Sequence, residues 1–303
     1  MGFYQRKQMI DFTLSLIKLI RIKHWLKNGL IFAAMLFAFR LSLHDFLICL
    51  QVFLGFSFFA SSIYIINDIF DIKRDRLHPK KKFRPLAAGK IKIWQAFIFF
   101  CLLLAIAVYL TSTISMMVFW FSVGYFVINI FYSFGLKHLP IVDVMILSIG
   151  FVIRVIIGAY AIGVSASRWI LLCTFFISLF LSFGKRKNEM EVLSAEHKNS
   201  HRKSISEYTD GFIDQMLGLT AGVSVIFYAL YTIDPNTVLR FQTDKLIYTT
   251  PLVVFGIFRY FHLLYNKNDG GDPVVIFSND WPLIIDFLLW IAFVVVVYLI
   301  YAK

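Results

Sequence analysis

Apolar residues run along this chain in long stretches, and polar residues gather in short clusters between them. A helix needs about 20 mostly apolar residues to cross a hydrocarbon core of about 30 Å, and most of these stretches approach or reach that length. The pattern predicts an all-α, polytopic integral membrane protein with about nine transmembrane helices. The expected spans are residues 25–41, 46–66, 93–111, 114–133, 141–163, 168–184, 214–233, 246–265 and 283–301. The first is short, and a polar run beginning at Gly184 ends the sixth.

The composition agrees with a membrane protein and narrows the choice of partners. Hydrophobic residues make up 59% of the chain and charged residues 16%, whereas soluble domains carry roughly 45–50% and about 25%. The basic residues lie at the ends of apolar runs and form no continuous groove with aromatics, so no nucleic-acid partner is expected. Cys49, Cys101 and Cys173 sit in separate apolar runs, which predicts neither a disulfide nor a zinc site.

Lysine and arginine predict the orientation through the positive-inside rule. They are concentrated before the first span and after the second and sixth, so we expect these segments and the N-terminus on the cytoplasmic side of the membrane. Residues 10–23 place apolar side chains at helical spacing among basic ones, as in a helix that lies on an anionic leaflet. We expect an amphipathic segment at residues 1–24 and a nine-helix catalytic domain at residues 25–303.

A compact acidic motif follows the second span. Asn67, Asp68, Asp71 and Asp75 are spaced so that the three aspartates share one face of a continuing helix. Two carboxylates about 4 Å apart repel by about 1 kcal/mol in water and nearer 4 kcal/mol at an effective dielectric of about 20, so this face needs a counter-charge. We favour Mg²⁺, because it binds one or two carboxylates and takes other ligands from substrate phosphates.

Basic residues surround this motif. A solvated ladder of ion pairs with Arg74 and Arg76 is the structural alternative to a metal site, and positive-inside topology also explains part of the charge. Immediately downstream, HPKKKFRPLAAG places Lys80 and Arg84 in a turn flanked by two prolines. A basic turn next to a carboxylate–metal site suits a diphosphate, because the cations neutralise the oxygens that the metal leaves.

A second acidic cluster follows the sixth span, on the same predicted side of the membrane. Glu207, Asp210 and Asp214 are three and four residues apart, on one face of a helix that begins near Glu207. Together with the first motif they predict a shared cytoplasm-facing cavity with more than one metal ion. Lys185 and Arg186, at the end of the sixth span, are predicted phosphate ligands.

Two arginines fall inside predicted spans. Arg154 and Arg259 lie at depths where an ionised side chain normally faces a cavity or the interior of a helix bundle. Each is expected either to bind an anionic substrate or to pair structurally with Asp143 or Asp286.

These motifs resemble the UbiA superfamily of intramembrane prenyltransferases, which have nine helices, an NDxxDxxxD motif after helix two and a DxxxD motif after helix six. Within it, the chain is similar to decaprenyl-phosphate phosphoribosyltransferases in the stretches DRLHPKKKFRPLAAG, YSFGLKHLPIVD, GKRKNE, EYTDGFIDQ, FGIFRYFHLLY and GGDPVVIFSNDWPL. The resemblance implies catalytic, Mg²⁺-binding residues Asp68, Asp71, Asp75, Asp210 and Asp214. The substrate-binding candidates are Asn67, Lys80, Arg84, Lys137, Arg154, Lys185, Arg186, Glu189, Tyr208 and Arg259. Lys187-Asn188 departs from the expected pattern, which puts the contacts of that segment in doubt.

The resemblance implies transfer of 5-phosphoribose from phosphoribosyl diphosphate to a decaprenyl-like polyprenyl phosphate, with release of diphosphate, for synthesis of cell-envelope glycolipid precursors. The expected partners are these substrates and the lipid bilayer, and the sequence leaves room for a homo-oligomer. A conventional UbiA prenyltransferase, which moves a polyprenyl group from its diphosphate to an aromatic or glycerol-type acceptor, uses the same aspartates and is the main alternative. A membrane transporter is disfavoured, because no matching halves are evident and the acids cluster at one membrane boundary.

Overall fold

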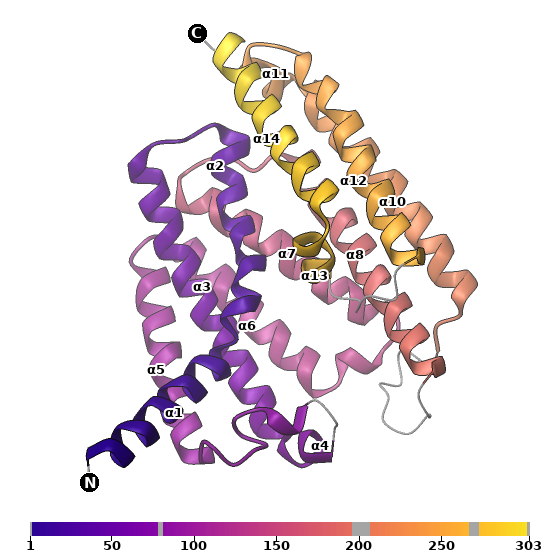
Figure 1. Cartoon of the computed structure of the whole chain (residues 1–303). Helices are drawn as coiled ribbons and strands as arrows, with labels where there is room; N and C mark the ends of the chain where they lie inside the picture. Colours follow the sequence, from indigo (N-terminus) through magenta and orange to yellow (C-terminus); the bar gives the residue numbers. More distant parts are fainter. Residues whose placement is uncertain (1, 78–80, 196–206, 267–272, 302–303) are drawn as a thin grey trace. The chain divides into compact units, whose positions relative to one another are not determined.

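The computed structural model describes residues 2–77, 81–195, 207–266 and 273–301, and every regular element in these ranges is a helix (Figure 1). Water cannot satisfy backbone N–H and C=O groups in hydrocarbon, so a chain this apolar pairs them within helices. The elements are α1 (Gly2–Ile20), η1 (Ile22–Phe32), α2 (Ala33–Ala38), α3 (Leu43–Phe70), α4 (Ile72–Leu77), η2 (Lys81–Phe83), α5 (Ile93–Ser112), α6 (Met116–Phe134), η3 (Leu136–His138), α7 (Val142–Ala161), α8 (Arg168–Ala195), α10 (Asp210–Ile233), α11 (Pro235–Phe241), η4 (Lys245–Thr249), α12 (Thr250–Asn266), α13 (Pro273–Asn279) and α14 (Trp281–Tyr301).

Within the described ranges, eight helical segments are long and apolar enough to cross a membrane. They confirm the prediction of a polytopic, all-α membrane protein, but the predicted ninth span is not among them. The difference lies at residues 25–41, where the structure has the 3-10 helix η1 followed by the short α2 instead of one continuous helix. α2 ends at Ala38, and the next residue, Phe39, adopts a left-handed conformation with φ 51°.

The helix that carries the sixth predicted span begins where the sequence predicts and continues beyond residue 184. α8 extends from Arg168 into the polar run as far as Ala195, so the helix does not end at Gly184. Arg186 and Lys187 are therefore carried by a helix, and both are buried. A hydropathy scale could not predict the burial of these two residues. It gives a charged residue the same polar value whether or not the fold provides an ion-pair partner.

Contacts divide the chain into two compact units, of which the first comprises residues 1–134 and 153–165. α3 is its central helix and packs against α1, η1, α5 and α6 (Figure 1). Gly55 allows α3 and α5 to approach closely, because a Cβ at this position would lie 3.0 Å from Cγ2 of Thr111. Small residues serve this purpose at many helix contacts in membranes.

Another close approach in the first unit joins α7 to η1. A Cβ at Gly158 would lie only 2.0 Å from the carbonyl oxygen of Ile31. Because the obstacle is backbone rather than a flexible side chain, only glycine fits this position without a shift of one element.

A buried apolar cluster anchors the end of α3 at which the acidic motif begins. It contains Ile65 of α3, Leu19 of α1, and Leu86 and Ile91 from the segment that precedes α5. All four side chains are fully or almost fully buried. The cluster therefore holds the basic segment around Arg84 next to the end of α3.

The second unit comprises residues 135–152 and 166–303. α8 packs along α10, and α12 packs along α14 and also contacts α10 (Figure 1). The core of this unit includes Phe180 of α8, Ile213 of α10 and Tyr260 of α12. These contacts fix the facing sides of α8 and α10, which carry the second group of charged residues.

α10 begins at Asp210, three residues later than the spacing predicted. Thr209 is its N-cap, with an extended backbone and a hydroxyl that accepts a hydrogen bond from the Phe212 N–H at 3.3 Å. Glu207 therefore lies outside the helix, and only Asp210 and Asp214 of the predicted acidic face belong to α10.

Candidate active site

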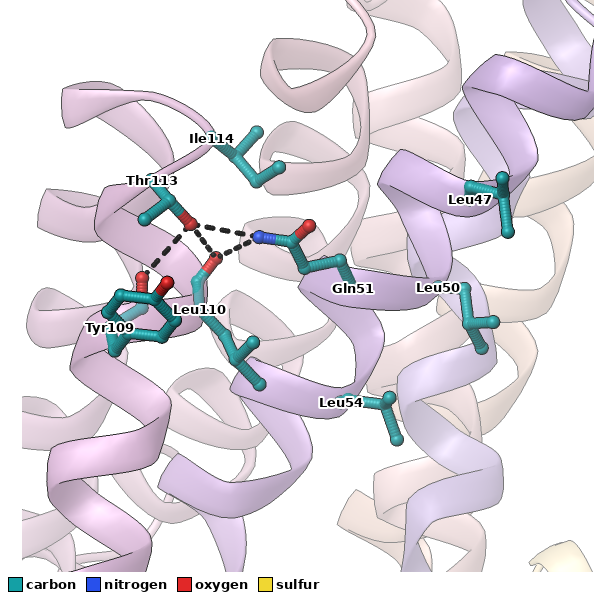
Figure 2. A pocket seen from close by; sticks show the side chains of 8 residues that line it. All are labelled: Leu47, Leu50, Gln51, Leu54, Tyr109, Leu110, Thr113 and Ile114. Atoms are coloured by element: carbon teal, nitrogen blue, oxygen red, sulfur yellow. Dashed lines mark hydrogen bonds between the residues drawn. The ribbon is translucent and has the colours of Figure 1, made fainter.

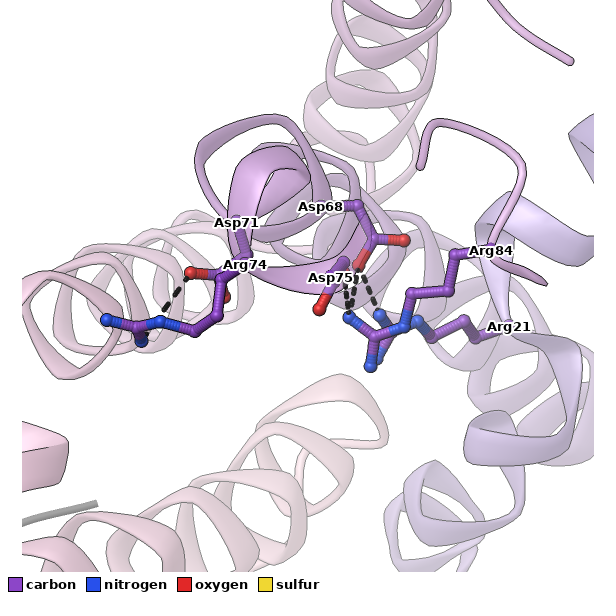
Figure 3. A network of polar contacts seen from close by, with 6 residues as sticks. All are labelled: Arg21, Asp68, Asp71, Arg74, Asp75 and Arg84. Carbon is purple, nitrogen blue, oxygen red and sulfur yellow. Dashed lines mark hydrogen bonds and ion pairs between the residues drawn. The ribbon is translucent and has the colours of Figure 1, made fainter. Parts of the chain in front are cut away.

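The first acidic motif spans a helix break. Asp71 is the C-cap of α3, with φ −90° and ψ 4°, and its N–H donates to the carbonyl of Asn67 at 2.9 Å. The short α4 begins at Ile72 and carries Asp75, whose N–H donates to the carbonyl of Asp71 at 2.8 Å. The prediction of one continuing helix is therefore wrong. Asp71 lies toward Arg74, away from Asp68 and Asp75, in Figure 3.

Arg84 joins the other two aspartates of the motif (Figure 3). Its Nη1 atom lies 3.1 Å from Oδ1 of Asp68 and 2.7 Å from Oδ2 of Asp75. Both aspartates are buried, with 2% and 3% of their surface exposed. A buried carboxylate without a partner is costly, so this one guanidinium compensates two acids from different helices.

A second arginine reaches the same cluster from the junction of α1 and η1. Arg21 forms an ion pair with Asp68, and its Cζ lies 4.7 Å from the ring centroid of Tyr64 on α3. The two arginines therefore balance the two buried carboxylates. The sequence predicted Arg21 only as an orientation signal, because its partner is 47 residues away and no local pattern relates the two.

Asp71 has a different environment from its neighbours. Its carboxylate lies 4.0 Å from Nη1 of Arg74, and the two side chains are 33% and 72% exposed. Exposed pairs of this kind contribute about 0–1 kcal/mol. The proposed ladder of local ion pairs therefore describes Asp71 and Arg74, whereas Asp68 and Asp75 pair with arginines outside the motif. Asn67 is half-buried in the last turn of α3.

The chemistry of these donors fits Mg²⁺ in part. Carboxylate oxygens are hard ligands of the kind that Mg²⁺ prefers, and Asp68 and Asp75 converge on one point. Among the described residues, however, no group of three acidic, histidine or cysteine side chains could enclose a metal ion. The arrangement suits an ion that takes one or two carboxylates here and its other ligands from water and a phosphate. Arg21 and Arg84 would compete with it for carboxylate oxygens.

In the second unit, Asp214 is held by Lys187 and Tyr265. Its Oδ1 accepts a hydrogen bond from the Tyr265 hydroxyl at 2.7 Å and forms an ion pair with Lys187 Nζ. This Nζ lies 4.5 Å from the Tyr265 ring centroid, within range of a cation–π contact. The Lys187 side chain is 7% exposed and that of Asp214 is 42% exposed. Lys187, which the sequence marked only as a departure from the expected pattern, is thus a cation in direct contact with the second motif.

Arg186 is buried on α8 and pairs with two acids. Its Nε lies 2.8 Å from Oδ2 of Asp143, and its Nη1 forms an ion pair with Glu189 one turn along the helix. Arg186 and Asp143 are 1% and 0% exposed. Both predicted substrate-binding residues, Arg186 and Glu189, therefore belong to one network with Asp143. The sequence indicated Asp143 only as a structural partner for Arg154 or Arg259.

Tyr208 completes this network from the segment before α10. Its hydroxyl donates to Oδ1 of Asp143 at 2.8 Å and accepts from the Ile141 N–H at 2.6 Å. Burial, together with the Asp143 carboxylate, raises the pKa of Tyr208 above its ordinary value. Ile141 has φ 66°, a strained conformation for a β-branched residue. This bonding arrangement helps to explain why the strain is tolerated.

Arg154 has neutral and aromatic partners inside the first unit. Its Nε donates to Oδ1 of Asn28 at 2.8 Å and its Nη2 to the Tyr125 hydroxyl at 3.0 Å. Its Cζ lies 5.0 Å from the ring centroid of Phe56. Asp143, one of its expected structural partners, pairs with Arg186 instead.

Arg259 of α12 pairs with Asp280 rather than with Asp286. Its Nε and Nη2 lie 3.1 and 2.9 Å from the two carboxylate oxygens of Asp280. Asp280 also accepts from the Leu283 N–H at 3.1 Å and so caps the start of α14. The arrangement favours a structural role for Arg259.

Three more of the predicted residues lie in the described part of the chain. Lys137 is half-buried in η3, Lys185 is half-buried on α8, and Asp210 is exposed at the start of α10. Lys80 lies outside the described residues. Their substrate roles stay predictions.

A cavity of about 510 Å³ lies between α3 and α5, away from the acidic motif (Figure 2). Gln51 reaches across it, and its Nε2 donates to the Leu110 carbonyl at 3.1 Å and to Thr113 Oγ1 at 2.9 Å. None of the residues that line it is charged. Gln51 precedes Asp68 by nearly five turns of α3, or about 25 Å, so this cavity is separate from the acidic motif.

Comparison with known proteins gives matches along most of the chain. The UbiA prenyltransferase family matches residues 29–279. A decaprenyl-phosphate phosphoribosyltransferase of Mycolicibacterium smegmatis is 35% identical over 293 residues, which cover 91% of this chain and 90% of the relative. A protein of the same name from Corynebacterium glutamicum is 33% identical, over 91% of this chain and 84% of the relative. Another from Mycobacterium tuberculosis is 32% identical, over 92% of each chain.

Solved structures match the fold. A UbiA homologue from Archaeoglobus fulgidus bound to GPP and Mg²⁺ aligns with a TM-score of 0.70 and 21% identity, over 94% of this chain and 99% of that chain. The same homologue bound to DMAPP and Mg²⁺ aligns with a TM-score of 0.68 and 21% identity, over 93% and 98% of the two chains. These likenesses confirm the predicted helical architecture.

Proposed function

The chain belongs to the UbiA prenyltransferase family of membrane transferases, and we propose that it transfers 5-phosphoribose from phosphoribosyl diphosphate to a polyprenyl phosphate of the decaprenyl type. The observation that carries this proposal is the match to relatives named for that activity, at 32–35% identity over more than nine-tenths of the chain. A match restricted to the aspartate motifs could not separate this reaction from prenyl transfer, because both expel a diphosphate.

The main requirement of the reaction is the stabilisation of negative charge on the substrates and on the leaving diphosphate. An oxygen of the acceptor phosphate forms a bond to C1 of the ribose, while the bond from C1 to the diphosphate breaks and the diphosphate leaves with both electrons. The acceptor oxygen is already anionic, so it requires no proton transfer to a general base. The protein's task is to hold two anionic substrates together and to stabilise the leaving diphosphate.

The charged residues of both units suit this task. In the first unit, Arg21 and Arg84 are fixed by Asp68 and Asp75, and they supply guanidinium groups for phosphate oxygens. In the second unit, Lys187 lies beside Asp214 and supplies a further cation. Asp143 and Glu189 hold Arg186 in one orientation. We assign these basic side chains to the phosphates of the donor and acceptor.

Mg²⁺ is the proposed cofactor. Of the predicted ligands Asp68, Asp71 and Asp75, one or two would bind one ion, with its other ligands from water and a substrate phosphate, and Asp210 and Asp214 would hold a second ion or orient the ribose hydroxyls. When bound, Mg²⁺ would neutralise charge on the diphosphate leaving group. The A. fulgidus homologue was solved with Mg²⁺ and a prenyl diphosphate bound, which supports a metal in the proposed role.

The proposed location is the plasma membrane of a prokaryote, with the active site on the cytoplasmic side. Phosphoribosyl diphosphate is soluble and highly charged, and the basic segments around α4 and the end of α8 are those that the positive-inside rule assigns to the cytoplasm. The product, a lipid-linked phosphoribose, would serve as a precursor of envelope glycolipids.

Prenyl transfer is the second candidate function, favoured by the fold likeness to a homologue bound to GPP. The two functions are separated by incubating the purified protein in nanodiscs with Mg²⁺ and a labelled donor. Label passing from phosphoribosyl diphosphate to polyprenyl phosphate, and lost on chelation, supports the proposal. Transfer from a labelled polyprenyl diphosphate to an aromatic acceptor, with no transfer from phosphoribosyl diphosphate, would overturn it.

A further inference from the structure

A second cavity, of about 700 Å³, lies in the first unit where the end of α3, the segment before α5 and the start of α5 meet. Its apolar wall includes Ile69 of α3 and Ile93, Trp94 and Phe97 of α5. Arg76 and Lys92 also line it, and they are its only charged lining residues in the described part of the chain. We call it the α3–α5 groove. The proposed catalytic chemistry uses none of these side chains.

The apolar wall belongs to the membrane-facing surface. α5 is long and apolar enough to span a membrane. Ile93, Trp94 and Phe97 are 56%, 59% and 54% exposed, so they do not pack into the core of the unit. A tryptophan beside a helix end is also typical of the membrane interface. This part of the groove is therefore suited to a hydrocarbon chain.

The two cations lie at the polar end of the same groove. Arg76 of α4 is exposed, and its Nε donates to the Ala87 carbonyl at 3.3 Å, which holds the guanidinium close to the segment before α5. Lys92 is exposed and is the N-cap of α5. An apolar wall that begins one residue after a lysine matches a phospholipid, in which only a short glycerol unit separates the phosphate from the acyl chains.

We propose that the α3–α5 groove binds an anionic phospholipid of the surrounding bilayer, with its phosphate at Arg76 and Lys92 and an acyl chain along Ile93 and Phe97. The occupant is a lipid rather than a free phosphate, because a soluble anion would leave the exposed apolar wall without a partner. It differs from the reacting substrates, whose phosphates we assign to basic side chains that do not line this groove. The proposal does not depend on the enzymatic function.

The test measures quenching of Trp94 fluorescence by brominated lipids. The protein is reconstituted with brominated phosphatidylglycerol or brominated phosphatidylcholine, and the Trp94→Phe variant supplies the signal of the other tryptophans. One cation near an anionic headgroup strengthens association about fivefold. We expect phosphatidylglycerol to be preferred at Trp94 by at least that factor. Equal quenching by the two lipids in the unsubstituted protein would overturn the proposal, whatever the variants do.

A matched pair of double variants locates the headgroup. Arg76→Gln with Lys92→Gln should abolish the preference. Lys73→Gln with Lys90→Gln removes the same charge from exposed positions that do not line the groove, and it should retain the preference. Equal loss in both variants would mean general attraction to a basic surface. Relief of quenching by millimolar inorganic phosphate would mean a site for free anions; either result contradicts a lipid site.

Discussion

Arg84 lies between Asp68 and Asp75 and contacts a carboxylate oxygen of each, at 3.1 and 2.7 Å. The two acids come from different helices, separated by the break at Asp71. One guanidinium therefore joins the two buried acids of the motif, and we propose that it also binds a substrate phosphate. This double role makes Arg84 the residue whose replacement is most informative.

We predict that Arg84→Gln lowers turnover by about a hundredfold or more, because a preorganised donor to developing negative charge contributes on this scale. It should also lower the free energy of unfolding by about 1–3 kcal/mol, since two buried carboxylates lose a charged partner. Arg84→Lys keeps the charge and should recover much of the stability. Activity and thermal unfolding measured on both variants check this, and near-normal turnover in Arg84→Gln would exclude the phosphate role.

Variants at Asp71 distinguish a role in metal binding from a role in a structural ion pair. Its contact with Arg74 is long and exposed, so Asp71→Asn should leave the unfolding temperature almost unchanged. If Asp71 positions a catalytic metal, turnover should still fall by at least about a hundredfold. Arg74→Gln, which removes the other half of the pair, is the control and should keep near-normal activity. Equal, small losses in both variants would favour the ion-pair interpretation.

Lys187 provides a test in the second unit. Lys187→Gln removes the buried cation beside Asp214, and we expect a KM for phosphoribosyl diphosphate at least about tenfold higher, because a phosphate loses a charge-assisted hydrogen bond. Tyr265→Phe removes only the neutral donor to Asp214 and should have a smaller effect. Steady-state kinetics with varied donor measure both, and an unchanged KM in a folded Lys187→Gln variant would exclude a role for Lys187 in binding the donor.

The Tyr208–Asp143 hydrogen bond predicts a dependence of stability on pH. Burial raises the folded-state pKa of Tyr208 above its ordinary value of 10.0, so its stabilising contribution is complete below that ordinary value and is lost as pH rises through the folded-state pKa. Tyr208→Phe should therefore unfold at a lower temperature than the unsubstituted protein at pH 7. The gap should narrow at strongly alkaline pH, and a gap that widened there would contradict the sign of this shift.

The close approach of α7 to η1 predicts the effect of one methyl group. Gly158→Ala places a Cβ against the Ile31 carbonyl, and we expect a loss of about 1–3 kcal/mol in stability, as for other overpacked sites. Gly124→Ala on α6 is the matched control, since a Cβ there meets nothing within 4 Å. Thermal unfolding in the same detergent compares them, and equal unfolding temperatures would show that η1 can move.

The features that the sequence predicted well are those encoded locally. Long apolar stretches predicted the helices, and the spacing of acids placed both motifs at the ends of spans, because hydropathy and helical periodicity act over neighbouring residues. The break at Asp71 was not predicted, and the start of α10 at Asp210 was predicted three residues too early, since helix ends depend on backbone conformation as well as on residue type.

The partners of the charged residues could not be predicted in the same way. Arg21 and Asp68 are 47 residues apart, and Lys187 and Asp214 are 27 apart. Each pair forms only when helices distant in sequence pack side by side. Asp143 carried a usable signal, because an acid at the start of an apolar run usually has a partner, but the sequence offered Arg154 or Arg259 as that partner, and the structure has Arg186.

The most direct test of the proposed function is the fate of each phosphate of the donor. Phosphoribosyl diphosphate carrying radioactive phosphorus either at the 5-phosphate or at the terminal phosphate of the diphosphate is incubated with the protein, Mg²⁺ and polyprenyl phosphate. We predict that the 5-phosphate label enters the lipid and that the terminal label is released as inorganic diphosphate. Terminal label in the lipid, or no lipid label from either donor, would contradict phosphoribosyl transfer.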